Sequence, residues 1–131
     1  MAELPPETRE RGELEFFIEE RKEDRVISRM PVTPGMLNPF GTVHAGAILW
    51  LADVTATVLA RGAFETGPDG KGFPLAIDLH ATLLGNKRSG EIYGEARFVR
   101  RGRRVSVVRT RVTGEDGSLL VEVTTTHIPA G

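Results

Sequence analysis

The sequence predicts an α+β fold in which one long central helix is wrapped by a curved antiparallel sheet of five to six strands. Residues 45–60 are apolar on nearly every side, carry one charge at Asp53 and are rich in alanine and leucine, which favours a buried helix. Beyond residue 74, four segments alternate apolar and polar residues and are joined by short turns. Short links join antiparallel neighbours, because a parallel crossover needs about a dozen residues or more.

The length and composition indicate one small domain. A chain of 131 residues suits a single domain spanning 1–131, and residues 1–13, polar with Pro5 and Pro6, are expected to form a flexible or helical tail. The absence of cysteine excludes a thiol nucleophile, a zinc–thiolate site and an iron–sulfur cluster, and it suits a reducing compartment. The net charge of −1 argues against nucleic-acid binding. Because the first 25 residues are densely charged, unlike a secretory leader, we expect a soluble cytoplasmic protein with no membrane contact.

The elements before and including the helix follow from residue patterns. Residues 14–20 fit either a strand or one helical turn, and residues 25–32 alternate as a strand with one face made of Val26, Ser28, Met30 and Val32. Residues 33–43 contain two prolines and two glycines and are expected to form a loop. The apolar stretch 45–60 is too short to span a membrane comfortably, so we expect a helix buried on all sides.

The second half of the chain is expected to form four strands. These are residues 75–84, 91–101, 105–113 and 119–128. One face of the first is expected to hold Leu75, Ile77, Leu79, Ala81 and Leu83, and one face of the second Ile92, Gly94, Ala96 and Phe98. One sheet around one helix leaves an edge or a face to be covered, which indicates an oligomer.

Asp53 is the first candidate for chemistry. Burying a carboxylate in an apolar helix costs several kcal/mol unless it is paired or protonated. No lysine or arginine lies within one turn of it, since Arg61 is eight residues away. A solvent-facing or capping role for Asp53 is the alternative. Thr57 lies one turn later and could orient the carboxylate or a water, or it could bond to its own backbone as a core threonine.

The loop before the helix is the second candidate. It gathers polar and small residues at the point where the chain enters the helix: Asn38, Gly41, Thr42, His44 and Gly46. The free N–H groups and the dipole of a helix N-terminus stabilise negative charge on oxygen, so the N–H of Ala45 or Gly46 could serve as an oxyanion donor. His44 could position a substrate or simply support the loop.

A run of arginines is the third candidate. Seven of them fall within 15 residues that contain no acid: Arg97, Arg100, Arg101, Arg103, Arg104, Arg109 and Arg111. Their concentration around one glycine suits a phosphorylated ligand, and Lys87 and Arg88 could join them, although a solvated face is the simpler interpretation. RNA is disfavoured because aromatic residues for base stacking are scarce here.

Several other chemistries lack their residues. The chain has no P-loop, no G-x-G-x-x-G and no G-x-S-x-G motif. Its three histidines, His44, His80 and His127, do not have the spacing of a metal site. We therefore expect no metal.

The segment LNPFGTVHAGAILWLAD (residues 37–53) resembles the N-x-x-G-x-x-H-G-G signature, with its following A-D pair, of the hotdog-fold thioesterases. It is most similar to the PaaI-like (phenylacetic acid pathway) branch of the 4-hydroxybenzoyl-CoA thioesterase superfamily. The later strands and the G-R-R turn are similar too, so the resemblance spans residues 25–128. It implies a hotdog fold that hydrolyses a medium-chain or aryl acyl-CoA to the free acid and CoA, with no cofactor beyond the CoA of the substrate.

The resemblance also implies roles for individual residues. Asp53 would be the nucleophile or the general base, and Ala45 or the adjacent Gly46 would offer the N–H that polarises the thioester carbonyl. Asn38 would hold the water or carbonyl, His44 would support the loop, and Thr57 would lie near the carboxylate. A larger set would contact CoA: Asn86, Lys87, Arg88, Arg100, Gly102, Arg103, Arg104 and His127. The active site would lie at a homodimer interface, with dimers pairing into a homotetramer.

Two departures and three alternatives qualify this hypothesis. Ala45 stands where the family has a glycine, and Ala76 stands where some members have a serine or threonine. A hotdog hydratase or dehydratase is one alternative, which the lack of a second histidine in the helix disfavours. An acyl-CoA-binding protein without turnover is another, which the intact Asp53 disfavours. A purely structural oligomer would leave both Asp53 and the arginines unexplained.

Overall fold

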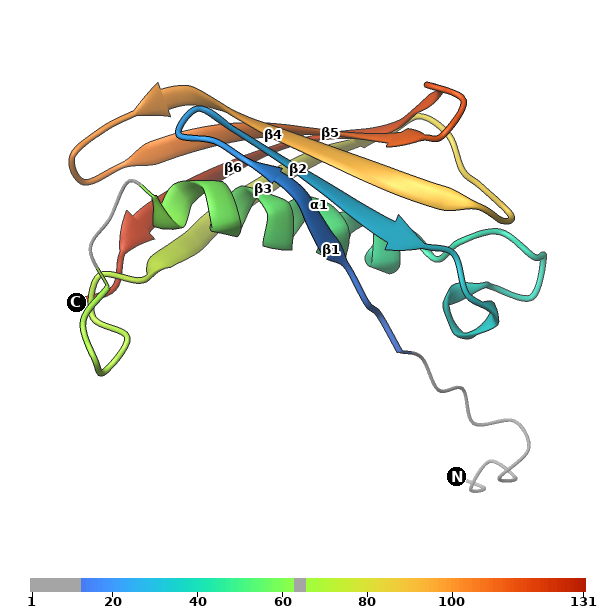
Figure 1. The fold of residues 1–131 in the computed structure, drawn as a ribbon, viewed down its shortest axis with the longest axis horizontal. Helices are drawn as coiled ribbons and strands as arrows, with labels where there is room; N and C mark the ends of the chain where they lie inside the picture. Colours follow the sequence, from blue (N-terminus) through green and yellow to red (C-terminus); the bar gives the residue numbers. More distant parts are fainter. Residues whose placement is uncertain (1–12, 63–65) are drawn as a thin grey trace, which may run out of the picture.

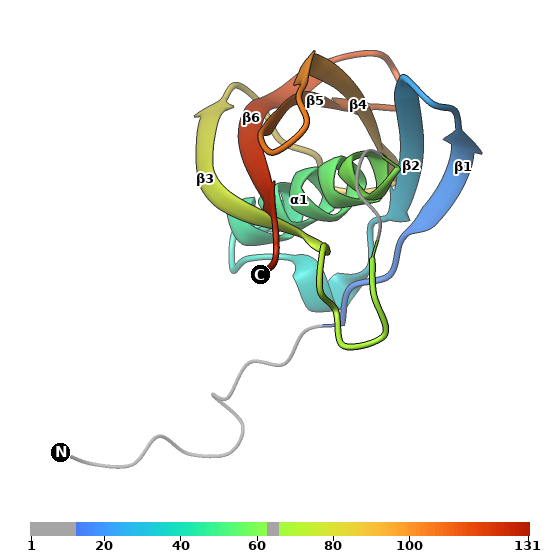
Figure 2. The ribbon, with the colours of Figure 1, turned by 90° about the vertical axis from the view of Figure 1, so that its left-hand side faces the viewer.

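The computed structural model describes residues 13–62 and 66–131, which form one curved antiparallel sheet with a helix along its concave side (Figures 1 and 2). The helix is α1 (Ala45–Arg61), preceded by the short 3-10 helix η2 (Pro34–Met36). The strands are β1 (Phe17–Arg21), β2 (Arg25–Pro31), β3 (Pro74–Leu83), β4 (Glu91–Arg101), β5 (Ser106–Gly114) and β6 (Leu119–Pro129). The predicted fold class is confirmed, while residues 1–12 of the predicted tail lie outside the described residues.

The six strands are ordered β1-β2-β4-β5-β6-β3, so β1 and β3 form the two edges. Residues 14–20, for which strand and helix were both open, contribute the strand β1. The pairing of β2 with β4 places Val26 opposite Ala96 and Met30 opposite Ile92, and all four side chains are buried. The alternation predicted for these two strands is therefore confirmed.

The core lies between the concave face of the sheet and one side of α1. Ile48, Leu51 and Leu59 project from the helix and are at most 2% exposed. They pack against a layer of buried strand residues that includes Met30, Ile92, Val108, Val112, Val121 and Val123. Burying each large aliphatic side chain contributes about 1.5–3 kcal/mol, so this contact fixes the helix on the sheet.

A buried hydrogen-bonded pair joins the helix to β2. The hydroxyl groups of Ser28 and Thr55 are 2.6 Å apart, and Thr55 donates to the carbonyl oxygen of Leu51 at 2.6 Å, which leaves the Ser28 hydroxyl as the donor to Thr55. Gly94 of β4 lies directly beneath them. A Cβ there would come within 2.7 Å of Ser28 Oγ and 3.1 Å of Thr55 Oγ1. The glycine is therefore required by the close approach of the helix to the sheet.

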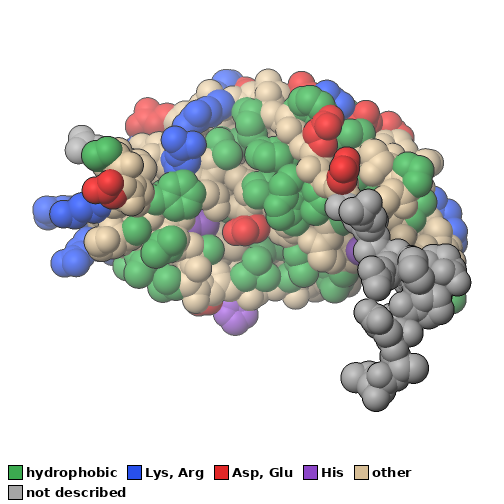
Figure 3. All heavy atoms as spheres, turned by 90° about the horizontal axis from the view of Figure 1, so that it is seen from below, with side chains coloured by type: hydrophobic (Ala, Val, Ile, Leu, Met, Phe, Trp, Pro, Cys, Tyr) green, Lys and Arg blue, Asp and Glu red, His purple; other side chains and the backbone are tan. Residues whose placement is uncertain are grey.

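The expectation of a helix buried on all sides is wrong for the single chain. Trp50, Asp53, Val54, Thr57 and Val58 are only half-buried, and they share the side of α1 that faces away from the sheet. Figure 3 views the molecule from this side and shows apolar side chains gathered across its middle. The reason is architectural: one sheet covers one side of a helix, and the described chain supplies no second layer.

Strand β3 also departs from its prediction. A register shift between Ala76 and Asp78 places Leu75 opposite Ile128 and Leu79 opposite Thr125. Thr125 faces the core and Ile128 does not, so Leu75 and Leu79 lie on opposite faces, and the single apolar face expected for this strand is wrong. Nine of the ten residues of β3 are exposed, and β3 is an edge strand of the sheet. Within the described chain, no helix has the length and apolar character needed to cross a membrane.

Candidate active site

Asp53 lies midway along α1 on the half-buried side of the helix. Among the described residues its carboxylate takes part in no hydrogen bond and no ion pair, in agreement with the absence of nearby cations in the sequence. Thr57 lies one helical turn further along and is also half-buried, without a hydrogen bond to Asp53 in the described chain. A partly desolvated carboxylate without a partner is available to act as a base or a nucleophile.

The loop that precedes α1 is organised around Asn38. Its side-chain oxygen accepts hydrogen bonds from the backbone N–H groups of Phe40 and Thr42 at 2.9 and 3.2 Å, and its amide nitrogen donates to Thr42 Oγ1 at 2.7 Å. Gly41 has a φ of +80°, a conformation that glycine adopts without strain. The structure thus uses the Asn38 side chain to build the loop, and Phe40 is left 82% exposed at its tip.

The start of the helix presents backbone N–H groups to the outside. His44 is the N-cap residue, and its carbonyl oxygen accepts hydrogen bonds from Ala47 and Ile48 at 2.9 and 3.4 Å. In a trans peptide the N–H points opposite to the carbonyl, so the N–H of Ala45 is directed away from the body of the helix. Ala45 and Gly46 are both exposed, and apart from the adjoining backbone nothing in the described chain lies within 4 Å of where a Cβ of Gly46 would be. These N–H groups have no intrahelical acceptor and can bind an oxyanion.

The link between β3 and β4 holds this loop from the other side. The Asn86 side chain accepts a hydrogen bond from the Val43 N–H at 3.1 Å and donates one to the Val43 carbonyl at 2.9 Å. The Arg88 guanidinium donates to the Phe40 carbonyl at 2.8 Å. Lys87 lies between them, and its ammonium group is 3.9 Å from a carboxylate oxygen of Asp116.

The arginines predicted to form one cluster fall into two groups. Three of them form ion pairs: Arg97 with Glu95, Arg101 with Glu23 and Arg109 with Glu122. Arg111 lies on β5 and forms no ion pair within the described chain. Arg100, Arg103 and Arg104 form none within the described chain, and with Gly102 they line a pocket at the β4–β5 turn, together with Val105 and Val107. We refer to residues 100–104 as the arginine turn. It is a site suited to phosphate groups.

The arginine turn and the helix start lie at opposite ends of the molecule (Figure 1). Arg101 donates to the carbonyl oxygen of Gly62, the C-cap of α1, at 3.1 Å. Lys87, in contrast, accepts a hydrogen bond from Val43, just before the start of α1, at 3.0 Å through its backbone carbonyl. The expectation that Lys87 and Arg88 join the arginines is therefore wrong within one chain, because the link from β3 enters β4 at one end and the arginine turn leaves β4 at the other.

His127 pairs with Ser106 at the same end of the sheet as the arginine turn, but its side chain faces the interior. It is 0% exposed, and its Nε2 lies 2.8 Å from Thr125 Oγ1, while its Nδ1 has no hydrogen-bond partner among the described residues. Burial is the largest influence on the pKa of His127 and lowers it, while the Pro74 backbone and the Asp53 carboxylate act in the opposite direction. The burial of His127 could have been predicted from the alternation of residues along β6. The buried face of this strand holds Val121, Val123, Thr125 and His127.

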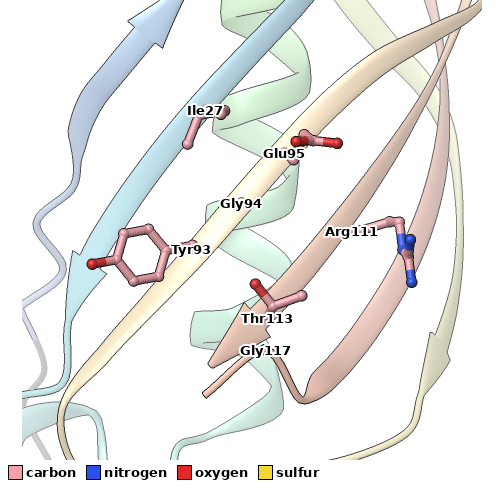
Figure 4. Close-up of a pocket in the computed structure, with 7 residues that line it drawn as sticks. All are labelled: Ile27, Tyr93, Gly94, Glu95, Arg111, Thr113 and Gly117. Carbon is pink, nitrogen blue, oxygen red and sulfur yellow. The ribbon is translucent and has the colours of Figure 1, made fainter. Parts of the chain in front are cut away.

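A second groove lies on the outer face of the sheet, away from α1 (Figure 4). Its lining includes Ile27, Tyr93, Glu95, Arg111 and Thr113. Because Asp53 and the helix start are on the other side of the sheet, this groove is not part of the candidate site. Within residues 13–62 and 66–131, no three metal-ligating side chains come together.

Comparison with known proteins agrees with this arrangement. The model of the thioesterase superfamily matches residues 40–121. A thioesterase of Haemophilus influenzae has a similar structure, with 26% identity, a TM-score of 0.77, and coverage of 86% of this chain and 76% of its own. A variant of a thioesterase enzyme from Staphylococcus aureus gives a TM-score of 0.82 at 21% identity, covering 88% and 93%. A hypothetical thioesterase of Streptococcus pneumoniae, solved with coenzyme A, gives 0.77 at 18% identity, covering 89% and 90%.

Proposed function

The chain belongs to the thioesterase superfamily and is a thioester hydrolase, and from this premise we propose that it cleaves medium-chain or aryl acyl-CoA esters of the kind handled by the PaaI-like branch. The observation that carries the proposal is the Asp53 carboxylate, half-buried on the open side of α1 and without a partner in the described chain. A positioned carboxylate that removes a proton from water accelerates hydrolysis by about 10²–10⁴-fold.

The N–H of Ala45, assisted by that of Gly46, is the oxyanion donor in this proposal. As water or Asp53 attacks the thioester carbonyl, negative charge develops on the carbonyl oxygen. The helix start offers N–H groups and the positive end of the helix dipole to this charge. One such donor typically contributes about 3–4 kcal/mol to the stabilisation of the transition state. The presence of alanine at position 45, where the family has a glycine, leaves this role intact, since the group used is a backbone N–H.

We propose that the catalytic unit is a homodimer formed through β3. This edge strand exposes apolar residues, with Ile77 and Leu83 both 55% exposed, and an uncovered apolar edge is a template for pairing with another strand. An antiparallel pairing of two β3 strands about a two-fold axis brings the helix start of one chain toward the arginine turn of the other. The half-buried side of α1 and the outer face of the sheet leave surface through which two dimers can form the proposed homotetramer.

In such a dimer the thioester would lie at the helix start and Asp53, while the phosphates of CoA would bind the partner's arginine turn and Lys87. The S. pneumoniae thioesterase that was solved with coenzyme A has the same fold, which supports a CoA ester as the ligand. The absence of cysteine suits a reducing compartment, so we place the activity in the cytoplasm.

A screen of acyl-CoA esters that vary in chain length and aromatic character tests the activity. A thiol-reactive dye reports released CoA without background, because the chain has no cysteine. We expect turnover by the native protein and a loss of at least about 10²-fold in Asp53→Asn. Calorimetric binding of CoA esters by the native protein without thiol release would instead identify a binding protein.

Mixing two inactive variants tests the shared site. Asp53→Asn and the double variant Arg103→Ala/Arg104→Ala each damage one half of it. If the halves come from different chains, a mixed dimer contains one intact site, and an equal mixture recovers about a quarter of the native activity at low substrate concentration. No recovery after subunit exchange would place both halves in the same chain.

A further inference from the structure

Asn86 lies in the link between β3 and β4, and its hydrogen bonds all go to backbone groups. Its side chain accepts from Val43 N–H at 3.1 Å and from Lys87 N–H at 2.7 Å, and it donates to the Val43 carbonyl at 2.9 Å. Side-chain amides have one acceptor oxygen and one donor nitrogen. Both lone pairs of the Asn86 oxygen and one of the two N–H groups of its nitrogen are therefore engaged with the protein, so only the second N–H is open to a ligand.

Val43, whose backbone is hydrogen-bonded to Asn86, lies two positions before Ala45, the proposed oxyanion donor. The Val43 carbonyl belongs to the peptide group that joins Val43 to His44, and the N–H of this same peptide donates to the Met36 carbonyl at 2.9 Å. Asn86 and Met36 thus hold the two polar ends of one peptide plane. The next peptide joins His44 to Ala45 and carries the N–H that we assign to the oxyanion.

The orientation of that second peptide follows from the first. The His44 carbonyl is held by the N–H groups of Ala47 and Ile48, and only the backbone angles of His44 separate the two peptide planes. Val43 is itself 0% exposed, and its N–H also donates to the Lys87 carbonyl at 3.0 Å. A change at Asn86 therefore propagates through one residue to the Ala45 N–H.

We propose that Asn86 is a positioning residue that fixes the Ala45 N–H in the orientation needed for the oxyanion, rather than a contact of CoA. This inference rests on the proposed function, and it gives Asn86 a different role from the one implied by the family resemblance. We call the hydrogen bonds between the Asn86 side chain and the Val43 backbone the Asn86 clamp. A misplacement of about 1 Å in a catalytic group can cost on the order of 10²-fold in rate, so the loss of this clamp should have a measurable effect on kcat.

Measuring kcat and KM separately distinguishes a positioning role of Asn86 from a direct contact with CoA. We expect Asn86→Ala to lower kcat by about 10-fold or more and to change KM by less than about 2-fold, because oxyanion donors act mainly in the transition state. Asn86→Asp keeps the acceptor oxygen and loses the donor to the Val43 carbonyl, so its kcat should fall as well. Ser89→Ala, an exposed neighbour on the same link, is the matched control and should match the native protein. A raised KM with kcat unchanged would overturn the proposal in favour of a CoA contact.

A second experiment tests the role of Asn86 by infrared spectroscopy and does not depend on turnover. In an Asp53→Asn background, isotope-edited infrared spectroscopy of a bound carbonyl-¹³C acyl-CoA reports how strongly the protein polarises the thioester carbonyl. We expect a shift of the carbonyl band to lower frequency that shrinks when Asn86→Ala is added, with circular dichroism confirming that both proteins are folded. Asn86→Asp in the same background takes the place of Asn86→Ala if the alanine variant does not fold.

The outcomes distinguish this proposal from the one it rests on. No band shift in the Asp53→Asn background would refute the oxyanion role of the helix start itself. A full shift that Asn86→Ala leaves unchanged would refute only the role of Asn86 and would leave the proposed function standing.

Discussion

The two sides of helix α1 differ in what they contact. On the side facing the sheet, Leu51 and Thr55 are fully buried, and the Thr55 hydroxyl takes part in two hydrogen bonds. On the opposite side, Asp53 and Thr57 are half-buried, and their side chains form no hydrogen bond within the described chain. The comparison indicates that one side of the helix determines the fold and that the other is left for chemistry. Substitutions on the two sides should therefore affect different measurements.

The largest expected effect is on turnover. Asp53→Leu should lower kcat by about 10²–10⁴-fold while leaving the free energy of unfolding unchanged or higher, because it removes a partly desolvated carboxylate without a partner. Thiol release and urea unfolding measure the two quantities separately. A clear loss of stability in this variant would contradict the division between the two sides.

The next largest effect is on stability alone. Leu51→Ala removes a fully buried side chain and should lower the free energy of unfolding by about 2–5 kcal/mol. Val54→Ala, on the half-buried side, is the control and should cost less than half as much. Equal losses in urea unfolding would show that both sides of the helix are equally packed in the assembled protein.

A matched pair of threonines sharpens the comparison further. Thr55→Val leaves the buried Ser28 hydroxyl without its acceptor and should cost about 1–3 kcal/mol, whereas Thr57→Val should change stability by less than about 0.5 kcal/mol. Adding Ser28→Ala to Thr55→Val should recover part of the loss, because it removes the orphaned hydroxyl. Thermal unfolding of the four proteins checks this, and a double variant less stable than the single one would contradict it.

The smallest expected effect is a dependence of stability on pH. Because burial lowers the pKa of His127 in the folded chain, the unfolded chain binds the proton more readily. The contribution of the neutral ring is complete above the unfolded pKa of about 6.5 and is lost as the pH falls from there through the folded pKa. His127→Gln should flatten urea-unfolding stability between about pH 7 and 5, and the exposed His80→Gln should not. A profile unchanged by His127→Gln would show that another group titrates.

Most helix and strand boundaries could be predicted from the sequence, because the helix is a long apolar run rich in alanine and leucine and most strands alternate apolar and polar residues. Residues 14–20 stayed open between strand and helix. The register shift at Ile77 could not be predicted, because an extra residue in a strand leaves the local composition unchanged. The separation of Lys87 from the arginine turn follows from their positions at the two ends of the predicted strand 91–101 and was nevertheless missed. The Asn86 clamp could not be read at all, because it depends on a contact between residues 43 positions apart.

The separation of the helix start from the arginine turn has a consequence for how rate varies with enzyme concentration. If each site draws on two chains, diluting the protein below the concentration at which chains pair removes the site while each sheet and helix stay folded. The rate per chain would then fall on dilution without any change in circular dichroism, and a high concentration of CoA ester would restore it by favouring the paired state.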